Sequence, residues 1–210
     1  MMKQAEVGCE TTLETMMREL RNLMGTGLAG LCAAGLLAAC ATVPSASAVD
    51  ATLPDAPRLV DASATLIDRS GEAVGSAQFF QGTDGVLMRI AVNGLTPGAH
   101  GMHFHAKGTC EDPQDGFMAT GGHIMPLGKP HGYMNPGGPH AGNLPNIFVG
   151  ADGTAIVELH THLVTVTGGM AALLDADGST LIIHESEDDH ITQPIGGAGG
   201  RLVCGVVEAP

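Results

Sequence analysis

The chain has 210 residues, and 9 Lys and Arg against 22 Asp and Glu give it a formal charge of −13. This balance argues against a nucleic-acid partner, because phosphate recognition needs an excess of cationic side chains, and an anionic membrane surface would repel the chain for the same reason. A content of 44% hydrophobic and 15% charged residues argues against wholesale disorder, and 31 glycines beside 5 Phe, 1 Tyr and no Trp favour a β framework with many turns over a helical bundle.

The N-terminal segment has the pattern of an export signal. Residues 23–43 carry no charge and are mostly Leu, Ala and Gly, with two arginines shortly before them. We therefore predict a signal peptide over residues 1–39, although the apolar run is also long enough to span a bilayer. The sequence Leu37-Ala38-Ala39-Cys40 resembles the box at which bacterial lipoproteins are cleaved and lipidated on the cysteine. Cleavage after Ala48 is the alternative. Either cleavage places the protein in the periplasm or outer cell envelope. After cleavage before Cys40, the lipid on Cys40 would be its only membrane contact.

The remaining chain is predicted to be a flexible tether over residues 40–57, rich in Pro, Ala, Ser and Thr, and one folded domain over residues 58–210. Eight segments of the domain have strand character and lie among Gly, Asp-Gly or Pro-Gly turn signals. They are 62–68, 76–81, 86–93, 100–105, 154–159, 163–166, 181–184 and 202–207. Since no stretch after Val43 has a helical period over three turns, these strands predict an antiparallel barrel or sandwich. Residues 108–145 are predicted to form one long loop, which a compact domain rarely keeps without a function.

Cysteine usage agrees with export. Cys9 and Cys32 would leave with the signal peptide and Cys40 would be lipidated, so Cys110 and Cys204 remain. In an oxidising compartment two remaining cysteines indicate one disulfide, and two buried free thiols are the alternative.

All ten histidines lie between His100 and His190. His103 and His105 are separated by one residue in a predicted strand, so both imidazoles leave the same face and can bind one metal. Four further histidines follow, three in the long loop and one at the end of an apolar strand: His123, His131, His140 and His184. A bare His-x-His pair is often a solvated strand face, but the added histidines favour a metal site. Imidazole ligands suit zinc, copper, iron and nickel, whereas calcium and magnesium prefer oxygen.

Several segments, in order along the chain, resemble the copper/zinc superoxide dismutases. They are residues 94–105, 122–123, 131–132, 140–146, 184–185 with 188–189, and 200–205. The similarity spans roughly residues 60–208, and such an ordered set is specific. The resemblance implies an all-β fold, an eight-stranded Greek-key antiparallel β-barrel with long metal-binding loops.

The resemblance also implies copper and zinc as cofactors, with superoxide as the substrate. The copper ligands fall on His103, His105, His123 and His184, and the zinc ligands on His123, His131, His140 and Asn143. Arg201 matches the guanidinium that orients the anion, and Asp188 matches the carboxylate that links ligands of the two metals. His100 matches a structural histidine, and Cys110 with Cys204 matches the family disulfide.

The implied activity is the dismutation of superoxide to oxygen and hydrogen peroxide by a copper that changes oxidation state, which zinc cannot do. His123 would then be both a ligand and a proton carrier. A non-catalytic copper-binding or copper-delivery protein on the same scaffold is the alternative. The full set of copper positions together with Arg201 favours the enzyme, because a storage protein needs no guanidinium that binds an anion. The oligomeric state stays open, with a homodimer as one option.

Two departures from the family pattern stand out. Asn143 replaces an aspartate, and its neutral amide oxygen is a weaker donor, so we predict a weakened or vacant zinc site. The loop over residues 185–200 carries four acidic residues and no lysine. Steering of superoxide would therefore depend on Arg201, with Lys107 or Lys129 as candidates for support, and we expect a slower and less salt-sensitive enzyme than a lysine-rich relative.

Some residues fall outside the pattern. His160 and His162 repeat the His-x-His spacing and are interpreted as an exposed strand face, with an accessory copper-capture site as the alternative. His190 is expected to be solvated. Four methionines lie near the ligand positions and are interpreted as core residues that fill gaps, with a copper(I) shuttle as the alternative. They are Met102, Met118, Met125 and Met134.

Overall fold

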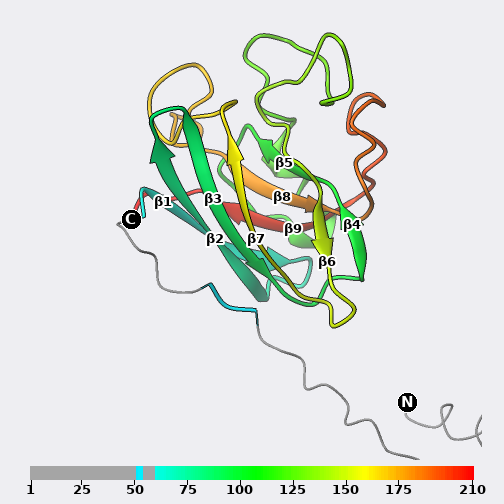
Figure 1. Ribbon diagram of the computed structural model, residues 1–210. Coiled ribbons are helices and arrows are strands. Elements are labelled where there is room, and N and C mark those ends of the chain that lie inside the picture. Colours follow the sequence, from blue (N-terminus) through cyan, green and yellow to red (C-terminus); the bar gives the residue numbers. More distant parts are fainter. Residues whose placement is uncertain (1–50, 54–59) are drawn as a thin grey trace, which may run out of the picture. The chain divides into compact units, whose positions relative to one another are not determined.

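Residues 51–53 and 60–210 are described by the computed structural model, and they form an all-β fold of antiparallel strands (Figure 1). The predicted signal peptide over residues 1–39 and Cys40 lie outside the described residues, as does the predicted tether except for residues 51–53. In that short piece Ala51 is buried, and its backbone N–H donates to Asn93 Oδ1 at 2.7 Å. In the part of the chain that the structure describes, no helix is long and apolar enough to cross a membrane.

The strands form a curled sheet with a short partner sheet (Figure 1). They are β1 (Ala62–Asp68), β2 (Ala73–Gly82), β3 (Gly85–Val92), β4 (Gly98–His100), β5 (Met102–His105), β6 (Ile147–Val149), β7 (Ala155–Thr161), β8 (Thr180–His184) and β9 (Arg201–Val206). The larger sheet has the order β5-β8-β9-β1-β2-β3-β7, and β4 pairs with β6. All of these pairings are antiparallel. Because β9 returns to lie beside β1, long connections as well as hairpins join neighbouring strands, which is typical of a Greek key.

The core lies under the sheet and explains why these segments are strands. In β1 the buried residues Ala62, Ala64 and Leu66 alternate with exposed ones, which is the two-residue period of a strand with one face on the core. The rings of Phe79 on β2 and Phe104 on β5 meet inside, with centroids 6.0 Å apart. β5 and β8 are buried along their whole length, so the histidines that they carry are withdrawn from water.

The strand predicted over residues 163–166 is wrong. These residues form bends with one isolated bridge, between Thr165 and Ala172. Val164 and Val166 are buried, but side chains take the place of a ladder partner: Leu163 N–H donates to Thr161 Oγ1 and Val166 N–H donates to Gln81 Oε1. The three-residue strand β6 was not predicted, because so short a segment carries no alternation.

The predicted strand over residues 100–105 is divided at Gly101 into β4 and β5. Gly101 N–H donates to the carbonyl of Ser186, and a Cβ at this position would lie 2.9 Å from Ala198 Cβ and 3.1 Å from Asp188 Cβ. The close approach of the later loop therefore interrupts the ladder. With this division, β6 gained and residues 163–166 lost, the described residues hold nine strands where eight were expected.

The long loop is present as predicted. Between β5 and β6 the regular elements are two short 3-10 helices, η1 (Pro113–Asp115) and η2 (Met118–Thr120). A disulfide joins Cys110 in this loop to Cys204 on β9, with the two Cα atoms 6.0 Å apart. The predicted disulfide is confirmed, and the alternative of two free thiols is wrong. The bond holds the first part of the loop against the sheet.

Candidate metal centre

Four histidines meet beside the sheet. His103 and His105 come from β5, His184 from the end of β8, and His123 from the long loop, where it forms an isolated bridge with His105. Each offers one ring nitrogen within 4.8 Å of the others. Pairing of β5 with β8 sets His103 opposite Ile182, and His103 Nδ1 lies 3.0 Å from His184 Nε2. We call this set the four-histidine cluster.

Hydrogen bonds on the far side of each ring decide which nitrogen is free. His105 Nδ1 lies 2.9 Å from the Gly121 carbonyl and His184 Nδ1 lies 3.2 Å from the Gly199 carbonyl, so each Nδ1 carries the hydrogen and donates it. His103 donates instead from Nε2, to a carboxylate oxygen of Asp188 at 2.8 Å. The remaining nitrogens present lone pairs to the centre of the cluster.

Two of those nitrogens, His105 Nε2 and His123 Nε2, are buried without a hydrogen-bond partner. Buried polar atoms are nearly always paired, so two unpaired acceptors that face one point fit the ligands of a cation. Burial lowers the pKa of His105 to about 2, with a further contribution from the charge of Arg201, and lowers the pKa of His184 to about 3. The imidazoles are therefore neutral at pH 7, the form that binds a metal.

A second cluster shares His123. His123 Nδ1 lies 2.8 Å from His140 Nε2, and His131 Nδ1 lies 3.4 Å from the same atom. Burial lowers the pKa of His140 to about 4. The three imidazoles fit a cation, and we call them the three-histidine cluster. His123 faces the four-histidine cluster with Nε2 and this cluster with Nδ1.

Asn143 lies beside the three-histidine cluster at its fourth corner, where a fourth ligand would be needed, and its amide NH₂ group faces the cluster. Its Oδ1 accepts the backbone N–H groups of Gly132 and His140 at 3.2 and 3.1 Å, which fixes the orientation of the amide. Its Nδ2 therefore faces His131 Nδ1 at 3.1 Å. His131 Nε2 carries a hydrogen, because it donates to Asp188 Oδ1 at 2.9 Å, so Nδ1 accepts from the amide. A cation fits the three imidazoles, but at this corner it meets N–H groups and no oxygen.

Asp188 connects the two clusters. It is 1% exposed, and its two carboxylate oxygens accept from His103 and His131. Burial acts to raise the pKa of Asp188, but these two hydrogen bonds outweigh it and hold the pKa well below its usual range. Asn146 holds the backbone of Asp188 through two hydrogen bonds of 2.9 Å.

The expectation that His190 is solvated is wrong. Its side chain is 20% exposed, its Nδ1 lies 3.3 Å from Asp188 Oδ2, and its ring packs edge-on against Tyr133. Sequence reasoning gave no role to His190 or Asn146. The spacing of His190 from Asp188 was the available signal, because an Asp side chain often binds the backbone N–H two residues on, as it does here at 2.7 Å.

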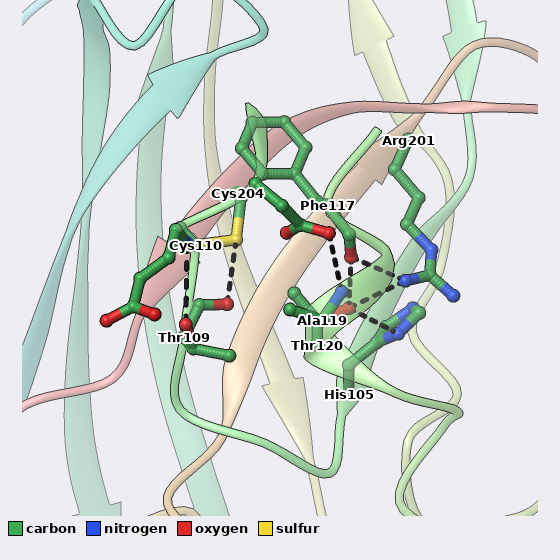
Figure 2. The surroundings of a disulfide bond; sticks show 10 residues. His105, Thr109, Cys110, Phe117, Ala119, Thr120, Arg201 and Cys204 are labelled. Atoms are coloured by element: carbon green, nitrogen blue, oxygen red, sulfur yellow. Dashed lines mark hydrogen bonds between the residues drawn. A yellow bond between two sulfur atoms is a disulfide. The ribbon is translucent and has the colours of Figure 1, made fainter. Parts of the chain in front are cut away.

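Arg201 is fixed beside the four-histidine cluster. Its Nη1 donates to the Phe117 carbonyl at 2.6 Å and to Thr120 Oγ1 at 2.8 Å, and its Nη2 donates to the Gly121 carbonyl at 2.9 Å. Figure 2 shows the bonds of Arg201 to Phe117 and Thr120 near the disulfide, with His105 beside Thr120. Because three bonds hold the guanidinium, its position is set before any substrate arrives.

A cavity of about 710 Å³ opens onto these residues. His105, His123, His184 and Arg201 line it, together with Arg69, Lys129 and Asp115. Arg69 was not predicted to lie at the site. It follows β1, and its guanidinium donates to the Gln114 carbonyl of the long loop at 3.3 Å. Lys107 is not among the lining residues. Three cationic groups against one carboxylate make the cavity attractive to a small anion.

Comparison with known proteins agrees with this geometry. Residues 73–207 match the sequence model of a family described as copper/zinc superoxide dismutase. The chain belongs to the copper/zinc superoxide dismutase family.

Two similar members of this superoxide dismutase family come from bacteria. The chain is 44% identical over 151 residues to the Cu-Zn superoxide dismutase of Caulobacter vibrioides, covering 70% of this chain and 86% of that protein. It is 43% identical over 145 residues to the superoxide dismutase-like protein YojM of Bacillus subtilis, covering 68% and 73%. The crystal structure of a double mutant of a SOD-like protein from Bacillus subtilis matches with a TM-score of 0.66 and 44% identity, over 69% of this chain and 95% of that one.

The remaining residues singled out in the sequence of this superoxide dismutase homologue are not members of either histidine cluster. His100 is buried and bonds to the His184 and Thr96 carbonyls at 2.7 and 2.8 Å. His160 on β7 and His162 just after it are exposed, and neither belongs to a metal-type cluster among the described residues. Met102 is buried, but the other three methionines are not in the core, which corrects the core interpretation: Met118, Met125 and Met134 are 64%, 55% and 69% exposed.

Proposed function

We propose that the protein dismutates superoxide to oxygen and hydrogen peroxide, with copper held by His103, His105, His123 and His184. The observation that carries this proposal is the set of neutral imidazoles with lone pairs aimed at one point, beside a guanidinium held by three hydrogen bonds. Bound copper supplies the one-electron chemistry that converts one superoxide to oxygen and a second to peroxide.

The chain's own residues bind the substrate and supply a proton. Arg201 attracts and orients the superoxide anion in the cavity that His105 and His123 also line. His123 is the proton carrier in this proposal. Its Nε2 faces the cluster without a partner, and its Nδ1 lies 2.8 Å from His140 Nε2, so a proton is held between those two rings.

Asp188 positions the rings. Through His103 and His131 it fixes the hydrogen of each ring on Nε2, which leaves both Nδ1 atoms without a hydrogen. Three features of this chain, a buried carboxylate, two carbonyl acceptors and the bridging His123, therefore preset the ligand lone pairs.

The zinc site is proposed to be weak. His123, His131 and His140 can hold zinc, but Asn143 turns N–H groups toward the fourth corner, and its oxygen is already engaged by two backbone donors. Zinc binding there must break these bonds and turn the amide, or leave the fourth position to water.

The alternative is a copper-binding or copper-delivery protein without catalysis. A relative named superoxide dismutase-like keeps this alternative open. The fixed Arg201 favours the enzyme, because copper binding alone gains nothing from a cation beside the cluster.

A dismutation assay on the copper-loaded full chain tests the proposal. Arg201→Ala is expected to lower kcat/KM by about ten- to a hundredfold with copper content unchanged. Arg89→Ala is the control, because Arg89 pairs with Glu158 on the neighbouring strand. An inactive parent that nevertheless retains copper would favour the binding protein.

Export with a lipid on Cys40 is part of the proposal and derives from the sequence alone. Membrane fractionation of the expressed full chain tests it. Cys40→Ser is expected to move the protein from the membrane to the soluble fraction, and an unchanged distribution would contradict lipidation.

A further inference from the structure

Two methionines lie where their thioethers do not contribute to the core. Met118 and Met125 are 64% and 55% exposed, although methionine usually fills gaps in protein interiors. Both line the 710 Å³ cavity that contains His105 and His123. Two soft sulfur donors therefore share a cavity with two ligand nitrogens that have no hydrogen-bond partner.

The backbone holds both methionines in place. Met118 directly follows Phe117, whose carbonyl accepts from Arg201. Met125 directly follows Ile124, whose N–H donates to the Phe104 carbonyl at 3.0 Å and whose carbonyl accepts from another loop N–H at 2.7 Å. Their side chains are thus free to move on anchored backbone at the edge of the site.

Charge makes neutral donors useful at this place. Arg69, Lys129 and Arg201 line the cavity against a single carboxylate, so the field that attracts an anionic substrate opposes the approach of a metal cation. A thioether binds a cation without adding charge, and among the first-row ions it selects copper(I).

We propose that Met118 and Met125 form a docking site for copper(I), from which the ion passes by ligand exchange to His105 and His123. Copper–sulfur bonds break as copper–nitrogen bonds form, and no electron is transferred. The inference rests on the proposed function, because it requires copper to be the metal of the four-histidine cluster. Met125 also lines a second groove of about 290 Å³ with Met170 and His162, so one further thioether lies in a groove that shares Met125.

The rate of copper uptake tests this site. Metal-free full-length protein is mixed with one equivalent of copper(I) as its acetonitrile complex without oxygen, and protein-bound copper is measured against time after rapid desalting. The same series is run with copper(II). The double variant Met118→Leu/Met125→Leu conserves apolar volume but removes both sulfurs. Met134→Leu is the matched control, because Met134 is 69% exposed and lines neither cavity.

We expect the double variant to take up copper(I) about tenfold more slowly, reach the same final copper content, and take up copper(II) at the parent rate. Equal copper(I) rates in parent and double variant would overturn the docking site, and so would equal slowing with both oxidation states, since that indicates a structural effect. If the parent binds neither ion at the four-histidine cluster, the proposed function fails and the docking site fails with it. If the parent takes up copper(II) normally and the double variant takes up copper(I) at the parent rate, only the docking site is refuted and the proposed function stands.

Discussion

The fourth corner of the three-histidine cluster can be tested by exchanging one group, with Asn143→Asp. A carboxylate oxygen in the place of Oδ1 keeps the bonds from the N–H groups of Gly132 and His140. The other end changes, because the Nδ2 that donates to His131 Nδ1 becomes an oxygen. Without metal, two acceptors then face each other. A bound zinc would use the same two atoms as ligands.

Asn143→Asp should therefore raise the affinity for zinc but lower the stability of the metal-free protein. Two unit charges 4 Å apart attract by about 4 kcal/mol at an effective dielectric constant of 20, and burial of the new carboxylate offsets part of this gain. Since about 1.4 kcal/mol is a factor of ten, we expect zinc affinity to rise by about a hundredfold. The metal-free variant loses a buried hydrogen bond and should be less stable than the parent by about 1–3 kcal/mol.

Zinc affinity is measured by competition with a chromophoric chelator on copper-loaded protein, and stability by urea denaturation of the metal-free form. Asn135→Asp is the control, because Asn135 lies in the same loop and its Oδ1 accepts only the N–H of Gly137, at 3.0 Å. A parent that holds one zinc per chain through mild chelation, as tightly as Asn143→Asp, would refute the reasoning on the amide.

Three further predictions follow from the same contacts. The buried histidines of metal-free protein have pKa values lowered to about 2 to 4 in the folded chain, so the unfolded chain takes up their protons first as pH falls below about 6.5. The free energy of unfolding should then drop by up to about 1.4 kcal/mol per pH unit for each histidine, and urea denaturation between pH 7.5 and 5 that gave a constant value would contradict this. Cys110→Ser should lower the free energy of unfolding by about 4–5 kcal/mol in the chain-entropy account, since the bond closes a separation of 94 residues; thermal unfolding measures this. It should also loosen the loop whose carbonyls accept from Arg201, and the dismutation rate measures that effect. Gly196→Ala places a Cβ against Asp188 Oδ1 and should lower metal affinity about 10–100-fold. Gly197→Ala is the control, because Gly197 also has a positive φ but its added Cβ would have no atom within 4 Å, so metal affinity should not change. Equal metal titrations of the two variants would show that Asp188 tolerates the methyl group.

Most of the strands could be predicted from local pattern, because burial on one face imposes the two-residue period that β1 shows, whereas the Greek-key barrel was implied by the resemblance to a family. The pattern failed where tertiary contacts replaced it. Residues 163–166 are apolar enough for a strand, yet their N–H groups bond to Thr161 and Gln81 side chains. Gly101 breaks a strand because a distant loop approaches it, and nothing local in the sequence indicates that approach.

For the candidate site, too, some features could be predicted from local pattern and others depend on tertiary contacts. The spacing of His103 and His105 predicts a shared face, but the meeting with His184 depends on the pairing of β5 with β8, for which the resemblance to a family was needed. The sequence shows that a carboxylate is missing at Asn143. Only the structure shows that the amide turns its N–H groups inward. Arg69 could not be found in advance, because its place at the cavity depends on the long loop, whose Gln114 carbonyl accepts from its guanidinium.

The contacts are consistent with the proposal that the copper site persists while the zinc site is weak. The lone pairs of His105 and His184 are set by the Gly121 and Gly199 carbonyls, neither of which is among the hydrogen-bond partners of the Asn143 side chain. Asp188 orients His103 through Oδ2 and His131 through Oδ1, so the orientation of His103 does not require a metal at the three-histidine cluster. His123 is the ring shared by both clusters, and without zinc its Nδ1 still finds His140 Nε2 at 2.8 Å. If the zinc site is weak, as we propose, a neutral residue at position 143 affects one cation site while the ligands of the proposed copper site keep their hydrogen-bond partners.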